Sequence, residues 1–172
     1  MTGIFYFDIL KAFQEEKVKY LVVGGFAVYL HGVHRVTNDL DVIISFDPVN
    51  LEKVKKVMNS LGYMPRLPGV KAEDLGNQKI LGDWIKNRNM LVFTFFQPSS
   101  HYRQLDILLS HPLDFKTAFK RKKTIKSGGI TINTVNSDDL IEMKKFSGRK
   151  QDLSDIEHLK RAAKFNGEKK EK

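Results

Sequence analysis

The sequence lacks cysteine altogether and contains only five prolines in 172 residues. Without cysteine there are no disulfide bonds, no thiolate metal sites and no cysteine nucleophile. Its longest strongly apolar runs, residues 21–30 and 91–96, fall well short of the ~20 residues that a membrane-spanning helix needs. The N-terminus does not have the pattern of a signal peptide. We therefore expect a soluble, cytoplasmic protein with no membrane partner.

Two nucleotide-binding signatures are missing as well. No Gly-Lys-Ser/Thr sequence of a P-loop occurs, and Gly24-Gly25 lacks the third glycine of a dinucleotide-binding fingerprint. What the sequence does have is 41% hydrophobic residues, enough for one domain with a packed core. It also has 29 basic against 20 acidic residues, a formal net charge of +9, which points weakly toward polyanionic ligands.

Much of the positive charge lies in one segment, residues 116–126, which has no acid among Lys116, Lys120, Arg121, Lys122, Lys123 and Lys126. One interpretation is the end of a helix followed by a charged edge strand, where lysine discourages pairing with other strands. The other is a phosphate-binding patch for a nucleic acid or a nucleotide. We favour the first, because these charges are not interleaved with a series of aromatic residues that would stack on bases.

Hydrophobic periodicity predicts helices that alternate with strands. The expected helices cover residues 4–16, 26–31, 48–60, 113–120, 137–146 and 153–165, with Asp47, Ser137 and Asp152 as N-caps. The expected strands cover 20–23, 39–46, 90–97, 102–109, 124–126 and 130–134, and 65–89 is expected to be mostly loop, with room for one short strand. This order predicts an α/β (α+β) fold, a mixed β-sheet flanked by helices. We expect a core over 1–135, a C-terminal helical segment over 136–166 and a disordered tail over 167–172.

Three acids are candidates for chemistry. Asp39 and Asp41 are two positions apart at the start of a predicted strand, so their carboxylates project from one face, about 6.5–7 Å apart. Asp106 lies in an apolar strand, where an acid is costly to bury unless it meets a partner or a metal. If the two strands are neighbours, the three carboxylates converge and could hold two Mg²⁺ ions about 3.5–4 Å apart for phosphoryl transfer.

Each of these features alone has an ordinary structural explanation, because Asp-x-Asp and Gly-Gly are both common at turns. Their order along the chain is more specific. Gly24-Gly25, a short helix, Arg35-x-Thr37-x-Asp39-x-Asp41 and a later Asp106 together resemble the nucleotidyltransferase superfamily, which has the polymerase-beta-like fold. The resemblance is greatest to its minimal and abortive-infection-type branch. The C-terminal residues Met143-Lys144, Gly148-Arg149 and Asp152-Leu153-x-Asp155 also match a pattern of that branch.

The resemblance implies a role for each matching residue. Asp39 and Asp41 would bind Mg²⁺, and Asp106 would complete the metal site and help to deprotonate the acceptor. Gly24 and Gly25 would let backbone N–H groups approach phosphate. Lys144 would reach over the phosphates, while Arg35, Thr37 and Arg149 are candidates for phosphate or structural contacts. Asp152 either joins the site or only caps the last helix. Many members have serine where this chain has Gly25, which puts one phosphate contact in doubt.

The implied activity is Mg²⁺-dependent transfer of a nucleoside monophosphate from a nucleoside triphosphate (NTP) to a hydroxyl. The acceptor is RNA such as a tRNA end, a protein or a small molecule, with the net charge slightly favouring RNA. The branch also implies a toxin or defence role and a cognate antitoxin as partner. The first alternative is a nucleotide- or RNA-binding module on the same fold with weak or no turnover. The second is a basic RNA-binding protein without a nucleotide site, whose RNA binding would depend steeply on salt.

Overall fold

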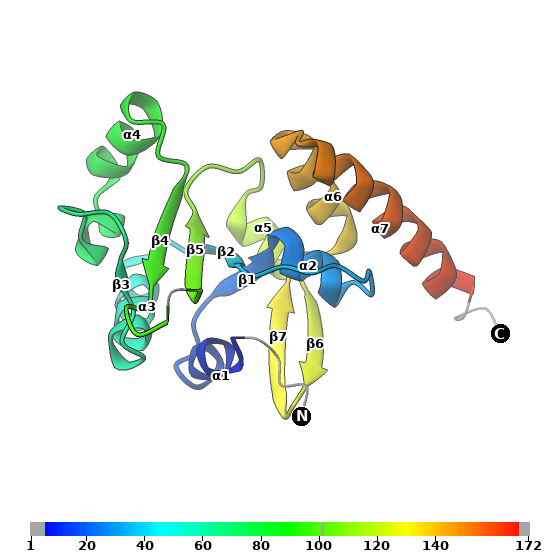
Figure 1. Ribbon diagram of the computed structural model, residues 1–172, viewed down its shortest axis with the longest axis horizontal. Helices are drawn as coiled ribbons and strands as arrows, with labels where there is room; N and C mark the ends of the chain where they lie inside the picture. Colours follow the sequence, from blue (N-terminus) through cyan, green and yellow to red (C-terminus); the bar gives the residue numbers. More distant parts are fainter. Residues whose placement is uncertain (1–5, 101, 169–172) are drawn as a thin grey trace.

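The computed structural model describes residues 6–100 and 102–168, and it contains a seven-stranded mixed sheet with helices packed around it (Figure 1). The strands are β1 (Tyr20–Val23), β2 (Leu40–Ile44), β3 (Met64–Pro65), β4 (Val92–Phe96), β5 (Gln104–Leu108), β6 (Lys123–Ser127) and β7 (Ile130–Thr134). The helices are α1 (Phe7–Glu15), α2 (Gly24–Leu30), α3 (Pro48–Ser60), α4 (Gln78–Asn87), α5 (Phe115–Lys120), α6 (Ser137–Ser147) and α7 (Lys150–Glu168), with a short 3₁₀ helix at Ala72–Gly76. The predicted fold class is confirmed.

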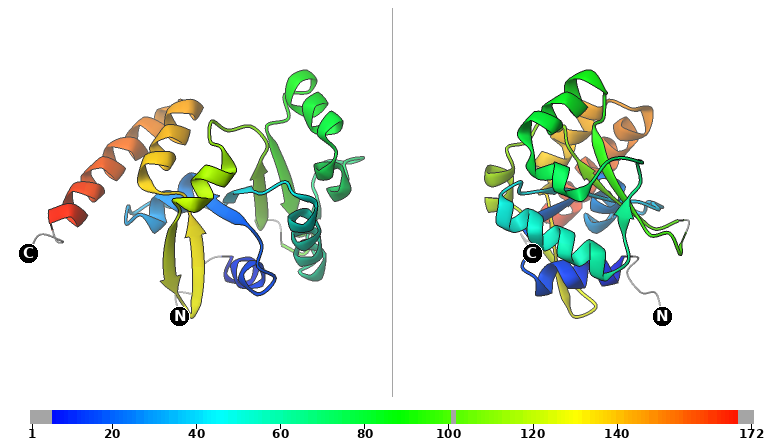
Figure 2. Two further views of the ribbon diagram at one scale, coloured as in Figure 1. Left: turned by 180° about the vertical axis from the view of Figure 1, so that it is seen from behind. Right: turned by 90° about the vertical axis from the view of Figure 1, so that its left-hand side faces the viewer.

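The strand order in the sheet is β3-β4-β5-β2-β1-β7-β6. β2 pairs antiparallel with β1 and parallel with β5, and this second pairing places Asp41 directly opposite Asp106. Figures 1 and 2 show α3 and α4 at one end of the sheet and α6 and α7 at the other. The two strands that carry the predicted acids are therefore neighbours near the middle of the sheet.

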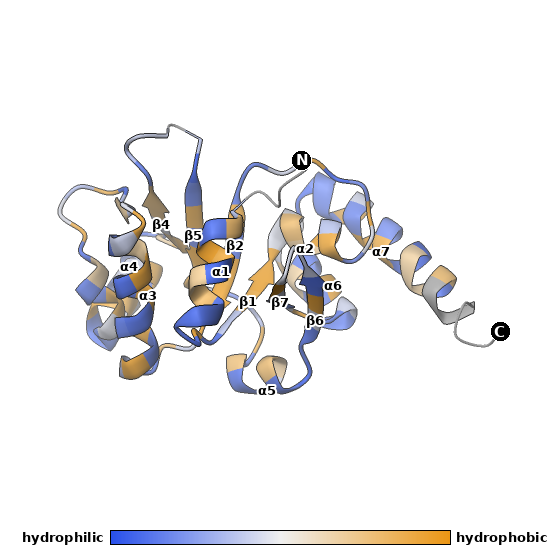
Figure 3. Cartoon of the chain, turned by 90° about the horizontal axis from the view of Figure 1, so that it is seen from below, coloured by the Kyte–Doolittle hydropathy of each residue, from blue (hydrophilic) through white to orange (hydrophobic). Residues whose placement is uncertain are grey.

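The central strands form the core. All four residues of β1 are buried, as are Leu40 and Val42 of β2, which alternate with Asp39 and Asp41 along the chain. Figure 3 shows these strands as the most hydrophobic part of the sheet. Burial alternates along β4 and β5. Phe93 and Phe95 of β4 and Leu105 and Ile107 of β5 are buried, while the other residues of these two strands are half-buried. This alternation leaves one face of β4 and β5 partly open.

Several predicted boundaries were wrong. The segment 65–89 is not mostly loop, because α4 lies within it, begins at an Asn77 side chain that accepts hydrogen bonds from two backbone N–H groups, and buries Trp84. The glycine and charge content of this segment concealed the helix. β2 begins at Leu40, so Asp39 precedes the strand. The cap of α6 is Asn136 rather than Ser137.

The two ends of the chain differ in how they match the prediction. Helix α7 begins at Lys150, three residues before the predicted start, so Asp152 lies within its first turn and not at the N-cap position. The helix continues to Glu168, and the rest of the predicted tail, 169–172, lies outside the described residues. The same holds for the first two residues of the predicted helix 4–16.

The basic segment 116–126 forms α5 and β6, and β6 is an edge strand of the sheet. Arg121 pairs with Asp139, and the Lys122 ammonium lies 4.2 Å from the centre of the Phe119 ring. This arrangement fits the interpretation of a charged edge strand. Among the described residues, no helix is long and apolar enough to cross a membrane.

Candidate active site

A cavity of about 490 Å³ opens between the middle of the sheet and the α6–α7 pair. All ten residues singled out in the sequence line it: Gly24, Gly25, Arg35, Thr37, Asp39, Asp41, Asp106, Lys144, Arg149 and Asp152. The other lining residues are Leu91, Val92, Leu108, Leu140, Met143 and Ser147. Segments from both halves of the chain therefore meet at one place, as the motif order predicts.

Asp39, Asp41 and Asp106 form the acidic group of the cavity. Asp41 and Asp106 are register partners on β2 and β5, and Asp39 comes just before β2. The Thr94 hydroxyl on β4, which is directly opposite Asp106, donates a 2.6 Å hydrogen bond to Asp106 Oδ1. The Gln104 side-chain amide donates a 3.3 Å bond to Oδ2 of the same carboxylate. Asp106 is thus held in a fixed orientation by two neutral donors.

The carboxylates of the acidic group repel one another. Burial, followed by the charges of Asp106 and Asp39, raises the pKa of Asp41 to about 7, although Lys144 and Arg149 act in the opposite direction. Burial also raises the pKa of Asp106, although the hydrogen bond from Thr94 lowers it. A raised carboxylate pKa means that the charged form is disfavoured. A positive charge placed among these carboxylates would therefore stabilise their charged forms.

The acidic group supplies only carboxylate oxygens, which are the ligands that Mg²⁺ prefers. In residues 6–100 and 102–168, however, no three His, Cys, Asp or Glu side chains are already arranged to hold a metal ion. The observation that fits a divalent cation is electrostatic, since burial and, after it, the carboxylates of Asp106 and Asp39 raise the pKa of Asp41. An ion bound here would relieve that repulsion.

The two glycines make close approach possible. Gly24 has a φ of +65°, and a Cβ on it would lie 2.1 Å from Asp41 Oδ2, so that any other residue would displace this carboxylate. A Cβ on Gly25 would lie 2.9 Å from Thr37 Oγ1 and 3.1 Å from Arg35 Cζ. The space that a serine side chain would take at position 25 is therefore partly filled by Thr37 and Arg35.

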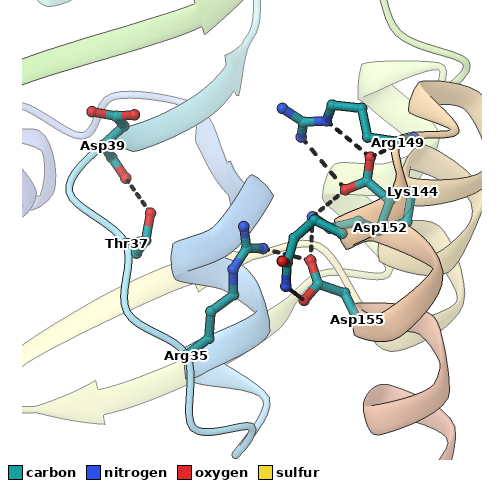
Figure 4. Close-up of polar contacts among 8 residues, drawn as sticks. Arg35, Thr37, Asp39, Lys144, Arg149, Asp152 and Asp155 are labelled. Atoms are coloured by element: carbon teal, nitrogen blue, oxygen red, sulfur yellow. Dashed lines mark hydrogen bonds and ion pairs between the residues drawn. The ribbon is translucent and has the colours of Figure 1, made fainter.

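Facing the acidic group is an ion-pair network of five residues, Arg35, Lys144, Arg149, Asp152 and Asp155. Lys144 Nζ lies 2.8 Å from a carboxylate oxygen of Asp152 and 2.8 Å from one of Asp155. Arg149 Nε pairs with Asp152 at 3.0 Å, and Arg35 Nη1 pairs with Asp155 at 2.5 Å. Figure 4 shows Asp39 and Thr37 on one side and this network on the other.

Lys144 is buried, with 3% of its surface exposed, whereas the neighbouring Lys145 is exposed. Lys144 is therefore not a solvated helix residue, and the structure separates two lysines that sequence alone treats as equivalent. An ammonium has three donors, and two of those on Lys144 are directed at Asp152 and Asp155. Its role toward phosphate stays a prediction.

Asp152 combines both of its proposed roles in geometry. Its side chain lines the cavity and also accepts a 3.1 Å hydrogen bond from the Arg149 backbone N–H, which caps the start of α7. Burial favours the neutral acid, but hydrogen bonds from Arg149 and Lys144 outweigh it and hold the pKa of Asp152 well below its usual range. Asp152 is therefore a charged, fully paired carboxylate.

Sequence reasoning assigned no role to several residues around the cavity. Thr94 is an ordinary strand residue in sequence, and only the pairing of β4 with β5 reveals its contact with Asp106. Asp155 belongs to the C-terminal motif, so its spacing of three from Asp152 was a signal that both lie on one helix face. Leu140 lies three residues before Met143 and four before Lys144, so the same helical spacing could have identified one inward-facing side of the helix.

Comparisons with known structures agree on the fold. The lincosamide antibiotic adenylyltransferase LnuA, solved with lincomycin bound, is 20% identical with a TM-score of 0.57, over 90% of this chain and 93% of that one. The antibiotic-resistance enzyme ANT(2'')-Ia, in complex with adenylyl-2''-tobramycin, is 12% identical with a TM-score of 0.52, over 88% and 83%. An antigenic nucleotidyltransferase-like protein from Paracoccidioides brasiliensis is 14% identical with a TM-score of 0.52, over 88% and 71%.

At these identities the likeness shows the fold alone. A search of curated protein sequences finds no match for the chain. A family model does match, and it covers residues 7–169, which includes every residue of the cavity. The chain therefore belongs to the family that this model describes, the nucleotidyltransferases of unknown function (DUF6036).

Proposed function

We propose that this nucleotidyltransferase moves a nucleoside monophosphate from an NTP to the hydroxyl of a small molecule. The observation that carries the proposal is the pair of opposed charge clusters in one cavity, the acidic group on the sheet and the ion-pair network on the helices. A triphosphate between the two clusters would meet Arg35, Lys144 and Arg149 on one side. On the other side it would meet Mg²⁺ held by the acidic group.

The acidic group fits Mg²⁺ by its donor atoms and its electrostatics. Asp39, Asp41 and Asp106 would hold the ion, which supplies charge neutralisation at the phosphates when bound. Because Gly24 and Gly25 have no side chains, Asp41, Thr37 and Arg35 can lie close to the backbone beside the phosphates. Lys144 and Arg149 lie near enough to Asp41 to lower its pKa, so they belong to the same electrostatic site.

In the proposed reaction, the acceptor oxygen attacks the α-phosphorus of the NTP and a new P–O bond forms. The bond from the α-phosphorus to the oxygen that bridges it to the β-phosphorus breaks, and pyrophosphate leaves with that oxygen. The hydroxyl proton goes to Asp106, whose carboxylate is held in place by Thr94 and Gln104. Catalysis then depends mainly on positioning and charge neutralisation.

A small hydroxyl compound is the acceptor class that the cavity supports best. Beside Asp106, the cavity wall is apolar, with Val92 and Leu108 as register partners on the partly open face of β4 and β5 and Leu91 next to them. Sites for small molecules combine such apolar walls with a few polar groups. Two of the structural neighbours carry lincomycin or an adenylylated tobramycin by their descriptions, which supports the same class.

RNA is the second acceptor candidate. It rests on the basic segment 116–126, in which Arg121 and Lys122 already have structural contacts with Asp139 and Phe119. We therefore place RNA behind a small molecule. No contact in the described part of the chain bears on the abortive-infection-type branch, a toxin role or an antitoxin partner, and these stay predictions of the sequence.

Release of pyrophosphate tests the proposal. The protein is incubated with Mg²⁺ and each of the four NTPs in turn, with lincomycin, with tobramycin, with total RNA or without an acceptor. Asp39→Ala/Asp41→Ala is the matched inactive variant, and exposed Asp138→Asn is the control that should keep full activity. Labelled nucleotide appearing in a small molecule with wild type alone supports the proposal, and transfer to RNA supports the second candidate.

The alternative of a binding module predicts a different result. NTP would then bind with Mg²⁺, and the Asp39→Ala/Asp41→Ala variant would lose that binding, but no NTP would release pyrophosphate with any acceptor tried. A basic RNA-binding protein would bind RNA equally well with and without these two aspartates.

A further inference from the structure

Asp155 is a buried carboxylate behind the cavity for which the proposed function has no role. Its side chain is 3% exposed and does not line the cavity, but both of its cationic partners do. It pairs with Arg35 at 2.5 Å and with Lys144 at 2.8 Å. Arg35 precedes β2, Lys144 is in α6 and Asp155 is in α7, so one carboxylate connects three separate segments around the cavity.

The Arg35 guanidinium is held on two sides. On one side it pairs with Asp155, and on the other it packs so closely on Gly25 that a Cβ there would lie 3.1 Å from Arg35 Cζ. Only 21% of the Arg35 side chain is exposed. A long side chain that is fixed before the ligand arrives loses little conformational entropy on binding. Figure 4 shows Arg35 directed toward Asp155 across the space between α2 and α7.

The charges of the network do not cancel. Arg35, Lys144 and Arg149 carry three positive charges, while Asp152 and Asp155 carry two negative ones, and all three cations line the cavity. Stability alone is a weak reason for this arrangement, because buried ion pairs add little over apolar packing of the same volume. The network instead leaves one excess positive charge in a fixed position at the cavity surface.

We propose that Asp155 is the positioning residue of this cavity, and that it sets Arg35 and Lys144 in place to contact the phosphates of the bound nucleotide. The proposal rests on the proposed function, since it concerns the same nucleotide. It explains why this chain can have glycine at position 25, because the fixed Arg35 guanidinium and the Thr37 hydroxyl occupy the space that a serine side chain would take.

Binding of Mg²⁺-ATP, of the other three NTPs with Mg²⁺ and of inorganic pyrophosphate, measured by titration calorimetry, tests the proposal. Asp155→Asn keeps the volume of the side chain and removes its charge, and Arg35→Gln removes the partner. We expect each single variant to weaken the binding of the preferred NTP at least tenfold. The NTP affinity of the double variant should be within about twofold of that of the weaker-binding single variant, because both changes remove one shared interaction. Asp138→Asn, on an exposed position of α6, should bind as wild type.

The outcomes separate this proposal from the function on which it rests. If wild type binds an NTP and Asp155→Asn binds it equally well, with only a lower melting temperature, then Asp155 is structural and the proposal is wrong. Additive losses in the double variant would also overturn it. If Asp155→Asn does not fold, the NTP affinity of Arg35→Gln is the test. An affinity equal to that of wild type overturns the proposal. If wild type binds neither any NTP nor pyrophosphate, the proposed function fails and this inference fails with it.

Discussion

Two groups of aspartates line or support the same cavity, and their electrostatics are opposite. In the acidic group, Asp39, Asp41 and Asp106 form no ion pair with any residue that the structure describes, and the pKa of Asp41 is raised to about 7 by burial and by its acidic neighbours. In the ion-pair network, Asp152 and Asp155 are more deeply buried, yet each contacts two cations. There the pKa of Asp152 is lowered.

The difference shows that burial alone does not decide the state of an aspartate. The network is complete as it stands, because three cations surround its two carboxylates. The acidic group has three carboxylates and receives the influence of cations at a distance, Lys144 and Arg149 acting on Asp41 and Arg66 acting on Asp106. Carboxylates without an ion-pair partner and carboxylates that already have cationic partners are thus distinguished by their contacts among the described residues.

The largest expected effect on stability comes from breaking the network. Asp152→Asn removes one of the two carboxylates that Lys144 contacts and should lower the free energy of unfolding by about 3 kcal/mol, since it leaves a buried ammonium with one partner. Urea denaturation at pH 7 measures this. Asp138→Asn is the matched control, with an expected change within about 0.5 kcal/mol. A loss of less than about 1 kcal/mol for Asp152→Asn would mean that the network is not the scaffold of this cavity.

The sequence predicts the acidic group better than the network. Asp39, Asp41 and Asp106 were grouped by the order of the motif and were expected to converge if their strands were neighbours, and the register of β2 with β5 puts Asp41 opposite Asp106. The network depends instead on how α7 packs on the loop before β2. Arg35 and Asp155 are 120 residues apart, and no local pattern links them.

Local signals also misled the prediction in identifiable ways. Glycine and proline between 65 and 89 favour a loop, yet Asn77 caps a helix there and Trp84 anchors it in the core. There tertiary packing overrode propensity. Asp152 was predicted as the N-cap residue, but it lies inside the first turn and caps the helix from there by accepting the Arg149 N–H, a local contact between residues three apart.

The acidic group should destabilise the protein at neutral pH when no cation is bound. The pKa of Asp41 is about 7 in the folded protein and about 4 in an unfolded chain, so folding holds a proton that the unfolded chain releases. The folded state has no penalty below about pH 4, and it loses stability as the pH rises toward 7. Three pKa units correspond to about 4 kcal/mol, and solvent screens part of this at a half-buried carboxylate. Asp41→Asn removes the penalty, so it should stabilise the protein by about 2 kcal/mol at pH 8.

Denaturation in urea with EDTA, at pH 4.5 and at pH 8, measures this difference. The stabilisation by Asp41→Asn should be much smaller at pH 4.5, because this pH is close to the pKa of Asp41 in the unfolded chain and far below its pKa in the folded protein. Millimolar Mg²⁺ should raise the stability of wild type at pH 8 and leave Asp41→Asn less affected. If Asp41→Asn is less stable than wild type at pH 8, then the like charges of the acidic group are already compensated within the chain.

The smallest effect concerns the hydrogen bond that orients Asp106. Thr94→Val keeps the shape and the strand preference of the residue but removes the hydroxyl that donates to Asp106 Oδ1. The loss of one hydrogen bond to a charged group corresponds to about 1.5 kcal/mol, so transfer should slow roughly tenfold. Thr124→Val, on the exposed face of β6, is the same substitution away from the cavity and should leave the rate unchanged. The rate of pyrophosphate release at saturating NTP measures both. An unchanged rate in Thr94→Val would show that Asp106 needs no orientation from β4, and that the contacts of the acidic group matter less than its charge.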